Sequence, residues 1–349
     1  MAKLFDFPEG TDYIKIRKQM SKILSKTRSL AKPSTCILCG NDQTSFCNSH
    51  SVPQLSLNNI ADNGKLLHAS ALMGVEIIDI EKGVNNSGTF HFICNNCDSK
   101  FFQDYENEEN LKSRPTDKVL AEIAVKNFLL QLSKRTHEVE IYKELQKQYK
   151  MYINPEEMAE INRLDIRDFN NEIQFHKTVV DSNITGGYQV LFWKVLPYRI
   201  PIAVQSVIAL TKDLEGNIIN YVSNISKDLS MRFMHIVVLP LKTESVILAF
   251  YHKRDKVYRN LRHQLNSVSD EKKLKYLNYL IFAHTENYFL SKTIKTEIDS
   301  NEKLSLLSTE YNGYPSFGVL GEHNSFGVGY EPIEIDDIPN FLSKEYSMK

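Results

Sequence analysis

The sequence predicts an α+β protein in which a small zinc-binding N-terminal module is joined through a helical hairpin to a C-terminal antiparallel sheet with helices. Three observations support this fold class. Two C-x-x-C pairs lie within the first hundred residues, and two long amphipathic helical patterns follow between residues 116 and 180. After Gly186 the chain changes to short runs rich in Val, Ile, Phe and Tyr, separated by turn residues.

The composition is that of an ordinary soluble globular protein. Of the 349 residues, 42% are hydrophobic and 24% are charged, and the formal net charge is −1. No segment approaches the roughly 18 consecutive apolar residues of a membrane span. The N-terminal MAKLFDFPEG lacks the apolar core of a secretory signal, so we expect a cytoplasmic protein without membrane contact. The sequence contains neither a phosphate-loop nor a dinucleotide-binding glycine motif, and nucleotide-dependent chemistry is not predicted.

The first predicted element is a basic amphipathic helix over residues 14–32. This segment contains seven Lys or Arg residues and no acidic residue, and Lys15, Lys18, Lys22 and Lys26 recur at helical spacing. A stripe of like charge repels itself unless it faces an anion. We therefore expect this helix to bind nucleic acid, and DNA in particular, with a solvated surface helix as the alternative interpretation.

Four of the five cysteines are predicted to hold a structural Zn²⁺ ion: Cys36, Cys39, Cys94 and Cys97. Each C-x-x-C pair lets two thiolates face one point, and two pairs complete the tetrahedral set that Zn²⁺ prefers. Two such pairs are typical of a metal site in a reducing compartment rather than of a disulfide framework. Cys47 stands outside both pairs, and we expect it to be a buried small residue rather than a ligand.

Two long helices are predicted next, arranged as a hairpin. Thr116, after Pro115, is the expected N-cap of the first helix, whose apolar pattern continues to about Tyr149. Residues 151–155 interrupt the pattern, and Pro155 takes the first position of the second helix.

The C-terminal part is predicted to form an antiparallel sheet, because its connections are too short for the crossovers that parallel strands need. The predicted strands are YQVLFWKVL, PIAVQSVIALT, NIINYVS, MRFMHIVVLPL and ESVILAFYH. Ser267 with Asp270 resembles a capping box at the start of a further helix. The chain is thus expected to divide into the basic helix and zinc module (1–110), a helical connector (111–180) and an α+β domain (181–349).

The order of motifs over about residues 33–105 resembles the HNH endonucleases. A C-x-x-C knuckle is followed by His50 with Pro53 three positions on, an Asn-containing turn, and a C-x-x-C that opens a helix. In that family the zinc-stapled module is a treble clef whose ββα-metal core cleaves phosphodiester bonds. More narrowly, the pattern is similar to a group of uncharacterised bacterial proteins with an HNH-like zinc region.

The resemblance implies a catalytic role for three residues. His50 falls at the general base, and Asn86, or its neighbour Asn85, falls near the asparagine that orients this base. Asp98 takes the place of the final metal-binding His and would bind a catalytic Mg²⁺ or Mn²⁺. The chain departs from the family pattern at two positions. Asp98 replaces the final His, and Ser49 stands where an Asp or His ligand is usual.

Simpler roles remain open for each of these residues. His50 could be a structural or zinc-binding histidine, the asparagines could be turn formers, and Asp98 could stabilise a helix N-terminus. The leading hypothesis is a metal-dependent nuclease or a nucleic-acid-binding effector. The resemblance also implies a role in bacterial antiviral defence, because HNH-like modules often occur in defence proteins. The alternative is a non-catalytic interaction or sensor protein, in which zinc is purely structural and the C-terminal domain binds a partner protein or a second copy.

Overall fold

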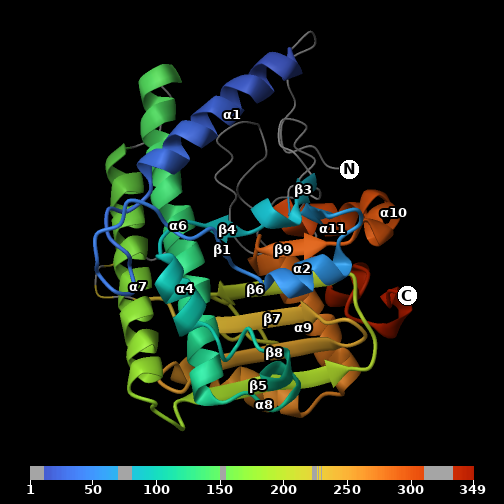
Figure 1. Ribbon diagram of the computed structural model, residues 1–349. Coiled ribbons are helices and arrows are strands. Elements are labelled where there is room, and N and C mark those ends of the chain that lie inside the picture. The colour runs from blue at the N-terminus through green and yellow to red at the C-terminus, as the bar shows by residue number, and fades with distance from the viewer. Residues whose placement is uncertain are drawn as a thin grey trace.

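A seven-stranded antiparallel sheet with helices on both faces forms the centre of the computed structural model (Figure 1). The structure describes residues 12–69, 81–149, 155–221, 226, 228, 230–309 and 333–349. Every neighbouring pair of strands in the sheet is antiparallel, so the predicted α+β class with an antiparallel sheet is confirmed. None of the described helices combines the length and the apolar character that crossing a membrane requires.

The sheet combines strands from distant parts of the chain. In spatial order its strands are β3 (Glu81–Gly83), β2 (Lys65–His68), β9 (Tyr288–Leu290), β6 (Ile202–Ile208), β7 (Met234–Pro240), β8 (Ser245–His252) and β5 (Tyr188–Leu196). Four of the five predicted strands therefore form. The fifth prediction, residues 217–223, is wrong in its described part, which makes only an isolated bridge at Ile218. There the Asn220 side chain bonds the backbone of Leu210 and Arg232, and these are the groups that a strand ladder would need.

The central strands are buried on both faces. Val204 and Ile236 enter one hydrophobic core, which is closed by the C-terminal helices. Their neighbours in alternation, Val207 and Val237, enter a second core shared with the long helices and the cysteine module. Because both faces are covered, every residue of β6 and β7 is buried, and neither strand alternates between buried apolar and exposed polar residues.

β2 and β3 come from residues 65–83, yet they belong to the sheet built mainly from residues 181–349. The link is the antiparallel pairing of β2 with β9, in which Leu67 lies opposite Leu290. The N-terminal segment therefore supplies one edge of the sheet. The domain boundaries at residues 110 and 180 stay a prediction.

The helices on the C-terminal side are α8 (Arg259–Asn266), α9 (Asp270–His284), α10 (Lys295–Ser300) and α11 (Glu302–Thr309). The N-cap of α9 is Ser269, whose hydroxyl accepts a hydrogen bond from the Lys272 N–H, and the prediction of Ser267 was wrong by two residues. The short 3₁₀ helices are η1 (Val84–Asn86), η2 (Lys256–Tyr258), η3 (Lys292–Ile294), η4 (Ile335–Asp337) and η5 (Lys344–Tyr346).

The predicted helical hairpin consists of α6 (Asp117–Tyr149) and α7 (Pro155–Asp181), which pack along each other (Figure 1). The basic segment forms α1 (Tyr13–Leu30), which lies across α6 and is tied to it by an ion pair of 2.7 Å between Lys26 and Glu144. Residues 121–130 of α6 are all buried, because the sheet, the hairpin partner and the cysteine module surround this stretch. Any polar side chain there must find a partner inside the protein.

The cysteine module places two paired strands before a helix, in the predicted order. β1 (Ser49–His50) pairs antiparallel with β4 (Thr89–Phe90), and α4 (Asn95–Phe101) follows. Two more short helices complete this region, α2 (Gln54–Ile60) and α5 (Glu108–Lys112). Side chains from β1 and α4 are thereby brought against the buried middle of α6.

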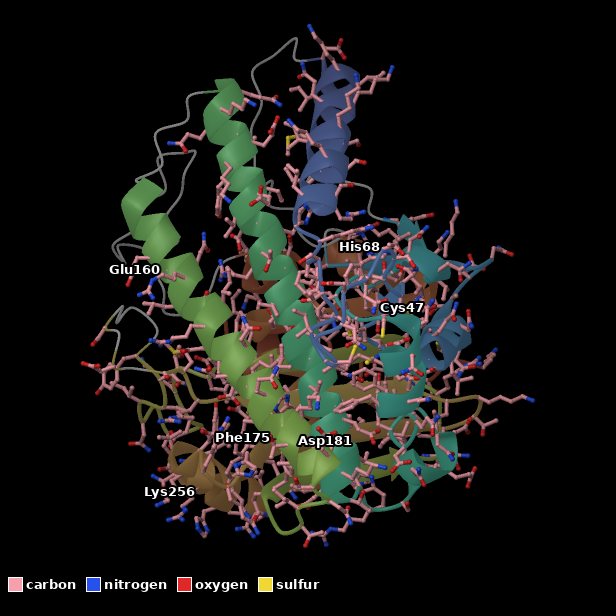
Figure 2. All side chains as sticks on the ribbon, turned by 60° about the vertical axis from the view of Figure 1, so that its left-hand side comes forward. Cys47, His68, Glu160, Phe175, Asp181 and Lys256 are labelled. Carbon is pink, nitrogen blue, oxygen red and sulfur yellow. The ribbon has the colours of Figure 1, made fainter. Side chains whose placement is uncertain are left out.

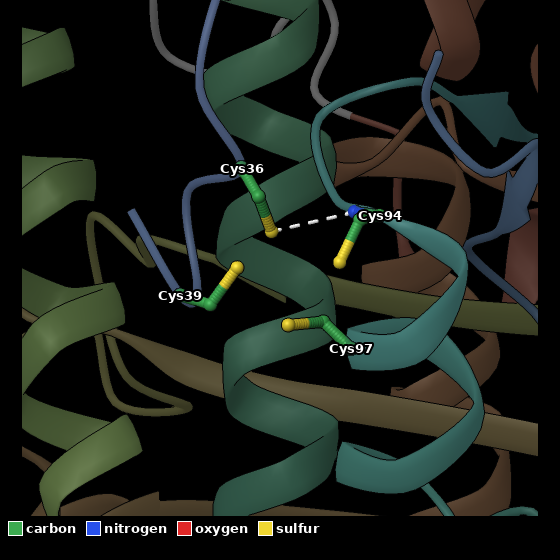
Figure 3. Close-up of side chains that lie close together, drawn as sticks. All are labelled: Cys36, Cys39, Cys94 and Cys97. Carbon is green, nitrogen blue, oxygen red and sulfur yellow. Dashed lines mark hydrogen bonds between the residues drawn. The ribbon is translucent and has the colours of Figure 1, made fainter. Parts of the chain in front are cut away.

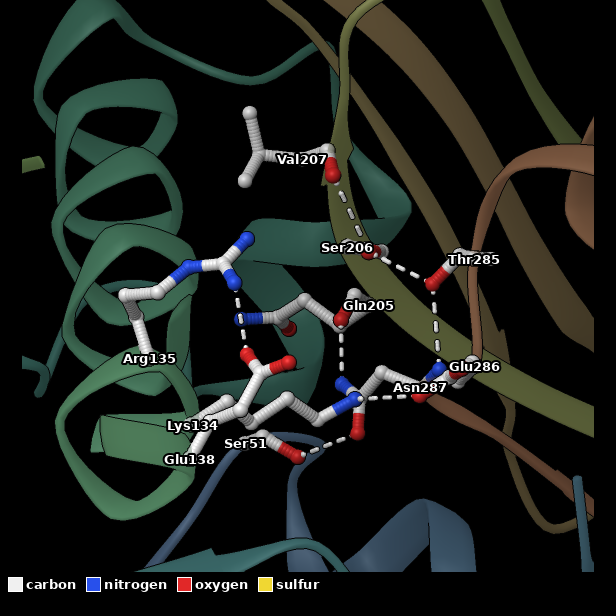
Figure 4. A network of polar contacts seen from close by, with 10 residues as sticks. All are labelled: Ser51, Lys134, Arg135, Glu138, Gln205, Ser206, Val207, Thr285, Glu286 and Asn287. Carbon is white, nitrogen blue, oxygen red and sulfur yellow. Dashed lines mark hydrogen bonds and ion pairs between the residues drawn. The ribbon is translucent and has the colours of Figure 1, made fainter. Parts of the chain in front are cut away.

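A buried polar network fastens the module to the sheet (Figure 4). The Ser51 hydroxyl donates to Asn287 Oδ1 at 3.1 Å, and Asn287 Nδ2 donates to the carbonyl of Gln205 on β6. Thr285 Oγ1 accepts from the Asn287 N–H at 3.0 Å and donates to Ser206 at 2.7 Å. The turn before β9 therefore joins the module to the central strand β6.

Gly88 is required at the point where the module meets the sheet. Its φ of 64° lies in the left-handed region, and its carbonyl accepts the Ser51 N–H at 2.9 Å. A Cβ at this position would lie 2.5 Å from Ser51 Oγ and 2.7 Å from the ring of Phe289. No side chain fits there without displacing the Ser51 hydroxyl and the Phe289 ring.

We predict that Gly88→Ala lowers the free energy of unfolding by about 3 kcal/mol, as left-handed strain and overpacking add together. Gly216→Ala is the matched control, since Gly216 has a φ of 84° and open space around it. It should cost about 1 kcal/mol, the conformational part alone. Chemical denaturation of both variants measures the difference, and equal losses would contradict the close packing at Gly88.

Candidate metal centre and the adjoining polar cluster

The first cysteine pair lies on a tight turn. The N–H of Gly40 donates to the Cys36 carbonyl at 2.8 Å, and Gly40 adopts a φ of 73°, which glycine takes without strain. A bridge between Thr35 and Asp42 closes the turn. Cys36 is buried and Cys39 is exposed, and both are held on one short loop.

The second pair lies at the start of α4. Cys94 is the N-cap residue and Cys97 is in the first turn, and the Cys94 N–H donates to Cys36 Sγ at 3.3 Å. The four sulfur atoms lie within 4.8 Å of one another and face a common point (Figure 3). A tetrahedral Zn²⁺ site with Zn–S bonds of about 2.3 Å separates its sulfurs by about 3.8 Å. The predicted cysteines are thus brought together in an arrangement that fits zinc.

The pKa values of the cysteine thiols favour the binding of a cation. Burial raises the pKa of Cys36, but backbone N–H groups, first that of Cys39 and then that of Cys94, lower it to about 7. Burial and the neighbouring sulfurs raise the pKa of the Cys97 thiol, since no second thiolate is favourable so close to the first. A bound dication removes this repulsion, and it would hold all four sulfurs as thiolates.

Asp98 directly follows Cys97 in the chain, and other side chains donate hydrogen bonds to both of its carboxylate oxygens. Its Oδ1 accepts from the Ser49 hydroxyl at 2.6 Å and from Lys126 Nζ at 2.8 Å, and its Oδ2 accepts from Cys47 Sγ at 3.2 Å. Lys126 Nζ also donates to Ser49 Oγ at 2.9 Å and lies 3.5 Å from Glu106. We call these five residues the Lys126 cluster.

Lys126 is the centre of this cluster. It lies in the middle of α6, its side chain is 1% exposed, and its ammonium stands 3.8 Å from the centroid of the Phe102 ring. Burial raises the pKa of Asp98, but the charge and hydrogen bond of Lys126, with those of Ser49 and Cys47, bring it below its usual range. Asp98 is therefore a carboxylate at neutral pH and is neutralised by Lys126.

His50 is half-buried on β1 and does not belong to the four-cysteine group. Its Nε2 lies 3.2 Å from the Val84 carbonyl, and because a carbonyl only accepts, Nε2 carries the proton and Nδ1 is left as an acceptor. Burial lowers the pKa of His50, an effect that the Val84 carbonyl opposes and that the Lys126 charge strengthens. The imidazole is neutral at pH 7.

The two asparagines of the η1 turn have different surroundings. Asn85 Oδ1 accepts from Gln54 at 2.7 Å, and the Asn85 carbonyl accepts from Asn48 at 2.9 Å. The Asn86 side chain is exposed. Among the described residues no hydrogen bond joins either asparagine to His50, whose ring is oriented by Val84 instead. The catalytic assignment of His50, Asn86 and Asp98 stays a prediction.

Lys126 is the residue that the sequence reasoning missed. It stands in LAEIAVKNFLLQL, at helical spacing from Ile123 and Leu130, both of which belong to the apolar stripe. A lysine at such a position cannot reach solvent, so it needs an acidic partner from another element. That partner, Asp98, lies 28 residues earlier in the chain.

Comparison of the chain with protein-family models, with curated proteins and with solved structures finds no match. The function must therefore be inferred from the residues of this chain.

We predict that the purified protein holds one Zn²⁺ per chain, measured by elemental mass spectrometry. Cys39→Ser and Cys97→Ser should each lose the ion and unfold at lower denaturant concentration, because structural zinc contributes to folding directly. Cys47→Ser is the control, since Cys47 is outside the four-sulfur group and a hydroxyl can also donate to Asp98. Zinc loss in Cys47→Ser would contradict the ligand assignment.

We further predict that Lys126→Met lowers the free energy of unfolding by about 3 kcal/mol, because it leaves Asp98 without its counter-charge. The double variant Lys126→Met/Asp98→Asn should lose less, since no charge is stranded. Lys143→Met is the matched control on the same helix. Lys143 pairs with Glu140 at 2.6 Å and its side chain is 65% exposed, so its loss should stay below about 1 kcal/mol. Similar losses for Lys143→Met and Lys126→Met would contradict the role of the cluster.

Proposed function

We propose that this protein is a zinc-stabilised nucleic-acid-binding protein whose HNH-like module binds without hydrolysing phosphodiester bonds. The observation that carries the proposal is the Lys126 ammonium on Asp98, at the position that the family resemblance gives to a catalytic ion. A carboxylate paired with an ammonium attracts a dication less, and repels a phosphate less, than a free carboxylate does.

A catalytic Mg²⁺ would have to compete with the Lys126 cluster for Asp98. Mg²⁺ requires oxygen ligands with free lone pairs at about 2.0–2.1 Å. Asp98 Oδ1 already accepts two hydrogen bonds, and Ser49 donates where the family usually supplies an Asp or His. An ammonium about 4 Å away repels each unit of positive charge by about 4 kcal/mol at an effective dielectric constant near 20. At the Mg–O distance the attraction of the ion to Asp98 is about twice as large, so the ammonium removes about half of it.

The basic helix α1 supports the nucleic-acid part of the proposal. Lys15, Lys18 and Lys22 are exposed, and within the described residues none of them takes part in an ion pair. The first turn of α1 contains no acidic residue. Phosphates that approach such a face release their counterions, which favours binding and makes it dependent on salt.

The expected result is binding of labelled DNA or RNA in fluorescence anisotropy, weakening as salt rises, with no cleavage in Mg²⁺ or Mn²⁺. The triple variant Lys15→Gln/Lys18→Gln/Lys22→Gln should bind more weakly, and its slope of log affinity against log salt should fall by about 0.9 for each duplex phosphate that the variant no longer neutralises. The control is the triple variant Lys212→Gln/Lys242→Gln/Lys256→Gln, which removes the same charge from exposed positions elsewhere.

Two outcomes contradict the proposal. Cleavage that depends on Mg²⁺ or Mn²⁺ and is abolished by His50→Ala would establish the nuclease alternative, with His50, Asn86 and Asp98 as its residues. If no DNA or RNA binds at any salt concentration, the protein is instead an interaction or sensor protein with a structural zinc site.

A further inference from the structure

A large basic cleft lies where the C-terminal end of α1, the β2–β3 hairpin and α6 meet. Its volume is about 1000 Å³, and it reaches the cysteine module at Asn86. In Figure 2, His68 of β2 lies by the end of α1 and beside α6. The cleft is distinct from the Lys126 cluster, because neither Lys126 nor Asp98 lines it.

The charge of the cleft is strongly one-sided. Four cationic side chains line it, from α1 and the residues after it (Arg28, Lys32), from β3 (Lys82) and from α6 (Lys134). The single carboxylate among the lining residues belongs to Glu286, which lies 3.6 Å from Lys134 (Figure 4). The cleft therefore carries an excess of three positive charges in a chain whose formal net charge is −1.

These cations act on each other and on the histidines around them. Lys82 is exposed but recessed, and this partial desolvation, with the charges of Arg28 and Lys134, lowers its pKa. Burial lowers the pKa of His68 to about 4, and Lys82 and Lys134 contribute to this. His91, which also lines the cleft, has its pKa lowered by burial and then by Lys32 and Arg28. All four cations of the cleft thus act on the histidines that line it.

We infer that this cleft binds consecutive phosphates of a nucleic-acid strand, through Arg28, Lys32, Lys82 and Lys134. Holding four cations together costs free energy that only an anion recovers, and phosphate oxygens accept from both lysine and arginine. A volume of about 1000 Å³ is at the upper end of small-ligand sites, so it suits a few nucleotides of a single strand better than a duplex. This inference rests on the proposed function, and it locates the phosphate path within that function.

The variant that tests the inference is Lys32→Gln/Lys82→Gln, because both side chains are exposed and neither replacement disturbs the core. The probe is a labelled single-stranded oligonucleotide of about 15 nucleotides, which is within the size range of single-strand binding sites. We expect about tenfold weaker binding, and a salt slope smaller by about 1.4, from two phosphate contacts at about 0.7 each. Lys212→Gln/Lys256→Gln is the control and should bind as the unaltered protein does.

Pyrophosphate as a competitor distinguishes strand phosphates from a small free anion. Displacement of the oligonucleotide only at high pyrophosphate concentration supports the inference, because a short anion spans only part of the cleft. If Lys32→Gln/Lys82→Gln binds the oligonucleotide normally while the α1 variant of residues 15, 18 and 22 does not, the cleft assignment is overturned and the proposed function stands. If the unaltered protein binds pyrophosphate but no nucleic acid, the proposed function and the strand assignment are both overturned.

Discussion

The ammonium of Lys126 is the constraint on which the arrangement of the N-terminal half depends. A buried cation is stable only when charged and hydrogen-bonding partners surround it, and Lys126 obtains them from two different elements: Ser49 on β1 and Asp98 on α4. Because Asp98 directly follows Cys97, the first turn of α4 joins the metal centre to the Lys126 cluster. The four-cysteine group lies at the centre of the module, and the Lys126 cluster fixes the position of the module on α6.

The pairing pattern explains how much of the fold could be predicted. The strands β5, β6, β7 and β8 are long and apolar, so local composition indicates them, and the hairpin of α6 and α7 is marked by Thr116 and Pro155. β2, β3 and β9 have three or four residues each, too few for a periodic signal, and their place depends on a contact between Leu67 and Leu290. No local pattern contains that contact. β9 (Tyr288–Leu290) begins four residues after α9 ends at His284, and its own three residues carry no pattern that indicates a strand.

The candidate site, like the fold, has a part that local sequence predicts and a part that depends on tertiary contacts. The cysteine pairs were predictable because a C-x-x-C turn brings two sulfurs together by local geometry, whatever the rest of the fold does. The surroundings of His50 and Asp98 were not, since they depend on Lys126 and on the Val84 carbonyl, which reach them through tertiary packing. The basic cleft could be predicted only in part. Two of its four cations, Arg28 and Lys32, lie in the predicted basic helix of residues 14–32, and the other two, Lys82 and Lys134, come from separate elements.

The pairing of β2 with β9 also has a consequence for synthesis of the chain. Residues 65–68 leave the ribosome long before residues 288–290, so the sheet edge cannot be completed until most of the chain has been translated. During that interval β2 has only β3 beside it, and its other edge, at Leu67 and His68, has no strand to pair with. Contacts of such large sequence separation slow folding. The two cysteine pairs are complete by Cys97, so a metal ion bound by these four cysteines would order the N-terminal module before its partner strand is made.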